Sequence, residues 1–211
     1  MTVVTRGARR GASPATIRKR PTTTRLLVAP LVAAAVALPL GSAAFGLYDR
    51  LLHWGKLVHG VDAFLVTLLF GLLLVAWRDA QRVDLSDELA ALTSMCTGVF
   101  FGVTWEIVEF VFDWLTYSDL QKSNTDTMTD FLWSDLGAAI AAVLAVRACC
   151  HWLSPRQRSE LGGTASYLAH GASRLLDRHG FLMTFVAAVV IAAAVTALWF
   201  SGRPVPGVQI P

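Results

Sequence analysis

The apolar residues of this chain fall in blocks about as long as a lipid bilayer requires, and this feature constrains the fold more than any other. A helix rising about 1.5 Å per residue crosses the hydrocarbon core in roughly 20 residues. Blocks of this kind lie at 27–47, 57–77, 89–115, 131–153 and 181–200. Strands of a barrel would instead alternate over about ten residues, a pattern that the chain lacks. The sequence therefore predicts an all-α, polytopic transmembrane helical bundle of about five spans.

Composition excludes other broad classes of protein. Of the 211 residues, 55% are hydrophobic and 16% are charged, against roughly 45–50% and 25% in soluble domains. The three cysteines are too few for a disulfide scaffold and lack the spacing of a zinc finger. A typical soluble domain and a disulfide-rich domain are both excluded.

Lysine and arginine are distributed unequally between the two sets of connections. Fourteen of the 18 lie before the first span, at 78–88 or at 147–180, and the others are Arg50, Lys56, Lys122 and Arg203. The positive-inside rule then places the N-terminus in the cytoplasm and the C-terminus outside, in a multi-pass protein of the cell (plasma) membrane. The excess of basic over acidic residues is explained by this topology, and no recognition motif indicates a nucleic-acid partner.

The segments around the four-helix membrane core at 27–153 receive separate predictions. Residues 1–26, rich in Thr, Arg, Gly and Pro, are expected to form a disordered basic cytoplasmic tail. Residues 154–180 carry apolar side chains at helical spacing. They are expected to form either a cytoplasmic amphipathic helix on the inner leaflet or a short helix packed on the bundle. Residues 201–211 follow the fifth span, 181–200, as a short outer tail.

A second interpretation of the first span stays open. The basic leader, the apolar stretch and the small residues Ser42, Ala43 and Ala44 also fit a signal peptide with its cleavage site. Cleavage would leave four spans. The rest of the chain would still begin outside, so the topology of the remaining spans would not change.

Ionisable side chains gather at the predicted outer ends of the spans. A charged group costs about 2.5–3.5 kcal/mol near the bilayer midplane, so these side chains are expected to face one another rather than lipid. The acids outnumber the nearby cations, and the excess requires a bound metal, a cationic substrate group or protonated carboxylates. The residues are Asp49, His53, His59, Asp62, Glu106, Glu109, Asp113, Asp126, Asp130 and Asp135.

Helical spacing sorts these residues into stripes. At about 100° per residue, Asp49 and His53 lie about 40° apart, and so do Asp126 and Asp130 if they are helical. The three acids at the end of the third span fall within about 60° of one another. His59 and Asp62 fit a helix face different from that of His53. The simplest arrangement is a bundle in which the stripes of spans two, three and four face one another.

Structural roles compete with this interpretation. Asp49 is placed to cap the second helix, and Asp126 or Asp130 is placed to cap the fourth. Glu106 and Glu109 can alternatively form a hydrogen-bonded pair that shares protons and joins two helices. These alternatives stay open at the level of sequence.

Four polar motifs follow one another within about residues 45–147. They are Tyr48-Asp49-Arg50-Leu51-Leu52-His53, Trp105-Glu106-Ile107-Val108-Glu109-Phe110, Asn124-Thr125-Asp126-Thr127-Met128-Thr129-Asp130 and Asp135-Leu136-Gly137-Ala138. In this order they resemble the motifs of the YjdF-like inner membrane proteins, a family of unknown function. A looser similarity extends to VanZ-like proteins, which are associated with glycopeptide (teicoplanin) resistance and share the Asp-x3-His opening, a helix-terminal acid and an acid near the start of the last helix.

The resemblance carries seven motif residues over to this chain and supplies no established reaction. The segment 56–59 looks like an insertion after the first motif, and the segments at 154–180 and 181–200 cannot be matched to the family. The seven residues are Asp49, His53, Glu106, Glu109, Asp126, Asp130 and Asp135.

The chemistry of these residues predicts an outward-facing acidic and histidine pocket that binds a divalent cation. Histidine with several carboxylates suits Mg, Mn, Zn or Fe, and all seven motif residues are candidate metal ligands. His53, Glu106 and Glu109 are in addition the candidate catalytic acids and bases. We expect a lipid-linked or envelope substrate and hydrolysis or phosphoryl transfer, although no motif of a known enzyme class is present.

Two other classes of function remain open. Intramembrane acids and a histidine also form ion or proton relays, so the chain is compatible with an ion- or proton-coupled transporter. It is also compatible with a structural subunit whose acids meet basic groups of another protein, since the small residues of span five suit helix packing. The lipid bilayer is a partner in every case. The oligomeric state and the identity of the metal are not predicted.

Overall fold

The computed structural model describes residues 24–51, 53–116 and 121–200, with side chains placed for residues 26–180 of these ranges. Every element in this part of the chain is a helix, which confirms the all-α prediction. Most of the predicted tail at 1–26, and all of the predicted tail at 201–211, lie outside the described residues. In chain order the elements are η1 (Thr24–Val28), α1 (Ala29–Ala44), α2 (Leu47–Arg50), α3 (Trp54–Gln81), α4 (Asp87–Thr116), α5 (Asn124–Arg147), η2 (Ala148–Trp152) and α6 (Pro155–Phe200).

Four helical segments are long and apolar enough to cross a membrane. They are Leu26–Ala44, Trp54–Gln81, Asp87–Thr116 and Asn124–Trp152. Large apolar side chains on these segments face outward, among them Phe100 at 65% exposure and Leu132 at 67%. Such a surface is unfavourable in water and suits contact with lipid. The described chain is therefore a helical protein with four candidate membrane spans.

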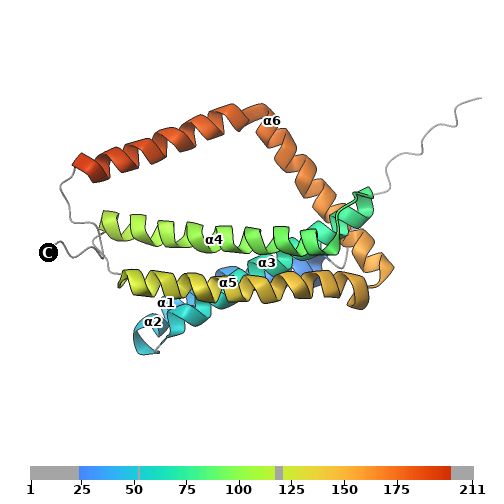
Figure 1. The fold of residues 1–211 in the computed structure, drawn as a ribbon, viewed down its shortest axis with the longest axis horizontal. Coiled ribbons are helices and arrows are strands. Elements are labelled where there is room, and N and C mark those ends of the chain that lie inside the picture. Colours follow the sequence, from blue (N-terminus) through green and yellow to red (C-terminus); the bar gives the residue numbers. More distant parts are fainter. Residues whose placement is uncertain (1–23, 52, 117–120, 201–211) are drawn as a thin grey trace, which may run out of the picture.

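The last helix, α6, runs without interruption through the predicted boundary at residue 180. It leaves the bundle and bends midway along its length (Figure 1). The fifth predicted span, 181–200, is the second half of this helix, and its side chains lie outside the described part of the structure. Whether this half crosses a membrane stays a prediction.

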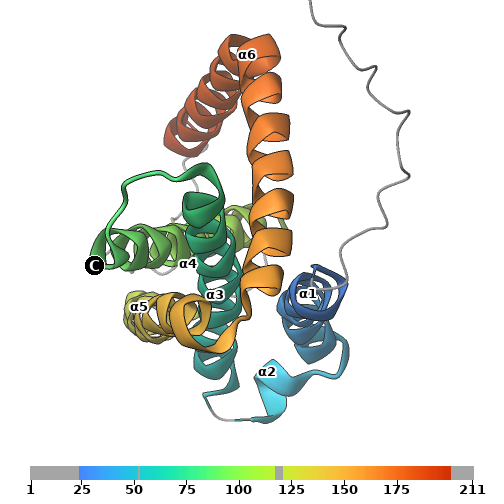
Figure 2. The ribbon, with the colours of Figure 1, turned by 90° about the vertical axis from the view of Figure 1, so that its right-hand side faces the viewer.

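Helix α3 is the centre of the bundle. It packs against α4 and α5, against α1 and against the start of α6, and Figure 2 shows it between α1 on one side and α4 and α5 on the other. Glycine permits the closest approach, because a side chain at Gly137 of α5 would collide with the carbonyl oxygen of Gly60 in α3. A side chain at Gly98 of α4 would likewise collide with the hydroxyl of Thr67. These contacts hold α3, α4 and α5 together along their lengths.

The two ends of the bundle differ in character. One end holds an apolar cluster of Leu72, Val75, Ala90, Ala145 and Cys149. We call the other the acidic end: it contains the start of α3, the end of α4 and the start of α5, and lies on the left in Figure 1. The acidic and histidine side chains that are candidates for a functional site lie at this acidic end.

The start of α6 packs on the bundle beside the apolar cluster. Leu161 is buried there, and Gly162 lies against the carbonyl oxygen of Ala76 in α3. Further along, Leu168 and Leu175 are about half exposed. The apolar stripe of 154–180 is therefore divided. Its first part packs on the bundle, and its second part has no such cover in the described structure.

Two of the capping roles that stayed open do not hold. Asp126 and Asp130 were the candidate caps of the fourth span, but α5 begins at Asn124, before both of them. Ser123 caps it: this residue is extended, and its hydroxyl accepts a hydrogen bond from the Asp126 backbone N–H at 3.1 Å. Serine is a favoured cap because its short side chain reaches the unpaired N–H groups of the first turn.

The alternative that Asp49 caps the second span does not hold either. Asp49 lies inside the short helix α2, and α3 begins separately at Trp54. His53 precedes α3 in a left-handed conformation, with φ 63°, and its side chain makes no capping hydrogen bond. The expected helical stripe of Asp49 and His53 therefore does not form, because the chain changes direction between them.

Candidate metal centre

Three helices each contribute one metal-ligating side chain at the acidic end. His59 comes from the second turn of α3, Glu106 from the last third of α4 and Asp130 from the second turn of α5. One ligand atom of each lies within 4.8 Å of the ligand atoms of the other two. We call these three residues the acid–histidine group. Residues 59, 106 and 130 are far apart in the sequence, so the group exists only because the three helices pack closely.

The carboxylates of this group are buried and only partly hydrogen-bonded. Glu106 is 3% exposed and Asp130 is 7% exposed. Glu106 Oε1 and Asp130 Oδ1 are buried and lack a hydrogen-bond partner within the described residues. Glu106 Oε1 lies 3.5 Å from His59 Nδ1. A buried, unpaired carboxylate oxygen is costly, and a cation between these oxygens would remove that cost.

Lys56 lies beside the acid–histidine group as an internal cation. Its Nζ is 2.6 Å from Asp126 Oδ1 and 3.6 Å from Asp130 Oδ1. Lys56 thus pairs mainly with Asp126 and leaves Asp130 incompletely compensated. With Glu106 included, three carboxylates lie near Lys56 and Lys122, and the second of these lysines is exposed. Among these described residues the acids still outnumber the lysines.

Gln121 connects the end of α4 to the start of α5. Its backbone N–H donates to Asp113 Oδ2 at 2.7 Å. Its side-chain Nε2 donates to the backbone oxygen of Glu106 at 3.1 Å and to Glu106 Oε2 at 3.0 Å. One carboxylate oxygen of Glu106 is thereby fixed, and the other is left facing His59. Gln121 is a positioning residue for this carboxylate.

Glu109 has a hydrogen-bond donor of its own. Trp105 Nε1, one turn before it on α4, donates to Glu109 Oε1 at 2.7 Å. Glu106 and Glu109 therefore have separate donors, Gln121 and Trp105. This arrangement differs from the alternative in which the two glutamates bind each other.

The structure brings together only part of the predicted ligand set. Glu106 and Asp130 belong to the acid–histidine group, and Asp126 adjoins it through Lys56. Asp135, five residues after Asp130, is rotated by about 140° on the helix and is half-buried elsewhere. The remaining predicted ligands, Asp49, His53 and Glu109, are not members of this group.

The histidine in the group is His59 rather than His53. His53 is exposed at the junction of α2 and α3, whereas the side chain of His59 is only 9% exposed. The sequence offered one signal for this choice, since Lys56, His59 and Asp62 recur every third residue on the face that α3 turns to its neighbours. No sequence pattern indicated a role for Gln121, because it lies in the connection before α5, where the side chains show no helical periodicity.

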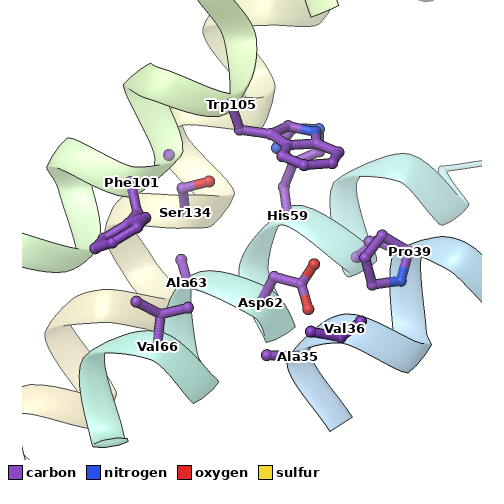
Figure 3. A pocket seen from close by; sticks show the side chains of 12 residues that line it. Ala35, Val36, Pro39, His59, Asp62, Ala63, Val66, Phe101, Trp105 and Ser134 are labelled. Atoms are coloured by element: carbon purple, nitrogen blue, oxygen red, sulfur yellow. The ribbon is translucent and has the colours of Figure 1, made fainter. Parts of the chain in front are cut away.

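A cavity of about 250 Å³ adjoins the acid–histidine group on the side of α1. Its lining comes from α1, α3, α4 and α5, and His59 belongs both to this lining and to the group. Figure 3 shows Asp62 of α3 with its carboxylate directed toward Val36 and Pro39 of α1. The site therefore has two parts: a polar group between α3, α4 and α5, and a cavity between α1 and α4.

Tyr48 of α2 lies close to the carboxylates of this region. Burial raises the pKa of its phenol from 10.0 to about 12, and the nearby carboxylates of Glu109 and Asp62 act in the same direction. The Ser42 hydroxyl of α1 acts in the opposite direction through a hydrogen bond, and it also accepts one from Trp54 Nε1 at 2.9 Å. Tyr48 thus links α1 to the acidic end as a neutral phenol.

The residues of the acid–histidine group fit a divalent cation. Two carboxylate oxygens without hydrogen-bond partners and one imidazole nitrogen form a mixed oxygen and nitrogen donor set. Such a set is suited to Mn, Fe or Zn, and it would leave positions for water or substrate. Such an ion could polarise a phosphoryl or carbonyl oxygen or lower the pKa of a bound water.

Comparison with known proteins identifies a family of predicted membrane proteins but indicates no reaction. Residues 12–151 match a family described as a predicted membrane protein (DUF2238). An uncharacterized protein of Thermotoga maritima is 32% identical over 103 residues, which are 47% of this chain and 51% of that protein. The chain thus spans about half the length of this relative. No solved structure matches the chain.

Proposed function

The chain belongs to the DUF2238 family of predicted membrane proteins, and on that premise we propose that it binds a divalent cation at its acidic end. The observation that carries the proposal is the acid–histidine group itself. His59, Glu106 and Asp130 converge from three helices, and two of their buried carboxylate oxygens have no hydrogen-bond partner in the described structure. Ionised carboxylates at this depth are unfavourable without a counter-charge.

Each residue has a separate role in this proposal. His59, Glu106 and Asp130 supply ligand atoms, and Gln121 holds the Glu106 carboxylate by its second oxygen. Lys56 compensates Asp126 and limits the net negative charge that the cation meets. The acid–base roles predicted for His53, Glu106 and Glu109 remain predictions, as does metal ligation by Asp49, His53, Glu109, Asp126 and Asp135.

We further propose that the substrate is a lipid-linked or envelope compound, processed by hydrolysis or phosphoryl transfer. Support comes from the cavity that adjoins the acid–histidine group, because its apolar lining suits the chain of such a compound. The predicted orientation, with the acidic end outside the plasma membrane and the N-terminus in the cytoplasm, would present the site to the envelope. The resemblance to YjdF-like proteins agrees with the family match and remains a prediction, as does the looser similarity to VanZ-like proteins.

Element analysis of the detergent-purified full chain tests cation binding. We expect about one transition-metal ion per chain for the wild type, and loss of this ion in Glu106→Gln and in Asp130→Asn. The matched control is Glu88→Gln, which makes the same change on α4 at the exposed, opposite end of the helix. A well-folded wild type that contains no metal, and takes up none on incubation with Mn²⁺, Fe²⁺ or Zn²⁺, would contradict the proposal.

Transport remains a second prediction with its own readout. It requires a polar path from the acidic end to the opposite end of the bundle. Between the two ends, α3, α4 and α5 pack closely at Gly98 and Gly71. The buried hydroxyls of Thr67 and Ser94 are polar groups within this packed interior. Metal-dependent or proton-dependent flux into proteoliposomes would support this alternative.

A further inference from the structure

The cavity beside the acid–histidine group changes character along its length. Near the acidic end it is lined by His59 and Trp105, and one turn deeper on α3 by Asp62. Deeper still, the lining consists of apolar side chains such as Val66 and Phe101. The order of these residues along α3 and α4 thus gives the cavity a polar outer part and an apolar inner part (Figure 3).

Asp62 has no partner of opposite charge in the described part of the chain. Its Oδ1 is buried and lacks a hydrogen-bond partner, and no ion pair within the described residues includes it. Lys56, six residues before it on α3, pairs instead with Asp126. Asp62 is eight residues after Trp54, about 12 Å along α3. A carboxylate at this depth needs either a proton or a cation supplied from outside the chain.

The cavity opens toward the surface that faces lipid. Figure 2 shows α1 on one side of α3 and α4 on the other. Three lining residues from these two flanking helices, Val36, Phe101 and Trp105, are each about half exposed. In a membrane this surface is bathed by lipid, so an amphiphile could enter from the side without crossing the packed interior of α3, α4 and α5.

We infer that this cavity binds a single-chain amphiphile with a cationic headgroup, with the ammonium group at Asp62 and the chain along the apolar inner part. The unpaired carboxylate selects the positive charge, and the Trp105 ring at the same end offers an aromatic surface of the kind that binds ammonium groups. The gradient from polar to apolar lining fixes the orientation of the ligand. A volume of about 250 Å³ suits one chain rather than a two-chain lipid.

This inference deepens the lipid-substrate part of the proposed function and does not require a metal ion. The amphiphile and the cation would meet only at His59, which both sites share. Binding of the amphiphile is therefore measured with a chelator present, and metal content is measured without the amphiphile. A negative result for amphiphile binding therefore leaves the metal proposal standing, and a negative result for metal content leaves the amphiphile proposal standing.

The probe is dodecyltrimethylammonium, a permanent cation that cannot ligate a metal. Native mass spectrometry of the detergent-solubilised full chain counts the bound molecules, with dodecanol as the neutral chain of equal length. We expect about one ammonium molecule per wild-type chain and about tenfold or more weaker binding to Asp62→Asn. Asp84→Asn, in the exposed connection after α3, makes the same change of charge outside the cavity and should bind like the wild type.

A second pair of variants tests the cavity independently of Asp62. Val66→Trp fills the apolar inner part and should abolish binding, whereas Val143→Trp, on the exposed face of α5, should not alter it. Equal binding to the wild type and to Asp62→Asn would overturn the inference. So would undiminished binding to Val66→Trp, or dodecanol binding as strong as that of the ammonium probe with the same response to Asp62→Asn.

Discussion

Nδ1 of His59 lies 3.5 Å from Oε1 of Glu106, across the contact between α3 and α4. Both side chains are nearly enclosed, and this oxygen of Glu106 accepts no hydrogen bond within the described residues. Asp130 completes the group from α5. The packing of three helices has therefore placed oxygen and nitrogen donor atoms close to one another, an arrangement that suits a divalent cation.

Removal of Lys56 should strengthen cation binding. Its Nζ lies 3.6 Å from Asp130 Oδ1, so it would repel a metal ion held by the same carboxylate. We expect Lys56→Met to bind Mn²⁺ about tenfold more tightly than the wild type, measured by competition with a chelator. The control is Arg147→Met, which removes an exposed cation from the last turn of α5, at the opposite end of the bundle. Weaker binding in Lys56→Met would instead indicate that this lysine holds the site together.

Gln121 should control metal affinity without ligating the metal. It donates to Glu106 Oε2 at 3.0 Å and fixes the direction of the other oxygen. Loss of a partner that orients a ligand typically lowers metal affinity about 10- to 100-fold, and we expect this of Gln121→Ala. The control is Thr125→Ala, at an exposed position four residues later. Unchanged affinity in Gln121→Ala, with a lowered melting temperature, would reduce Gln121 to a purely structural residue.

The crossing of α3 and α5 should not tolerate a side chain at Gly137. The added Cβ would meet the backbone oxygen of Gly60, which cannot move without displacing α3. Overpacking of this kind costs about 1–3 kcal/mol, so Gly137→Ala should lower the melting temperature in detergent and also weaken the metal site. Gly163→Ala on α6, where a Cβ meets nothing within 4 Å, should leave the metal site unchanged and should not lower the melting temperature, because alanine favours a helix over glycine. Equal melting temperatures would contradict the close packing described.

Tyr48 should titrate at unusually high pH. Its pKa is raised from 10.0 to about 12 by burial and by nearby carboxylates, which favour the neutral phenol in the folded state. The resulting contribution to stability is complete below pH 10 and is lost as the pH rises through about 12. The difference in ultraviolet absorbance between wild type and Tyr48→Phe isolates this phenol. A midpoint near 10 would show that Tyr48 is not enclosed as described.

The membrane bundle could be predicted from the sequence because bilayer thickness fixes the length of an apolar block. Helix boundaries could not be predicted in the same way. The polar stretch from Asn124 to Asp130 reads as a loop by hydropathy, yet the Ser123 cap begins α5 seven residues before the expected start. A helix start is determined by the hydrogen bonds of its first turn, and hydropathy does not report them.

Part of the candidate site could be predicted from the energetic cost of placing charged groups in a membrane. Glu106 and Asp130 stood out because acids are unfavourable inside spans, whatever their neighbours. The choice of His59 over His53 depended on backbone conformations that no sequence pattern shows. Leu51, at the end of α2, is extended, and His53, just before α3, is left-handed, so His53 lies outside both helices. Gln121 depended on the path of the connection between α4 and α5, which only the folded chain defines.

In the proposed function, His59 holds a divalent cation together with Glu106 and Asp130. The most direct test is the metal content of purified His59→Ala beside His53→Ala. The two variants lose the same side chain from the same region, one inside the acid–histidine group and one exposed at its edge. The structure predicts that His59→Ala loses the ion and that His53→Ala retains it. Loss from His53→Ala with retention by His59→Ala would contradict the account.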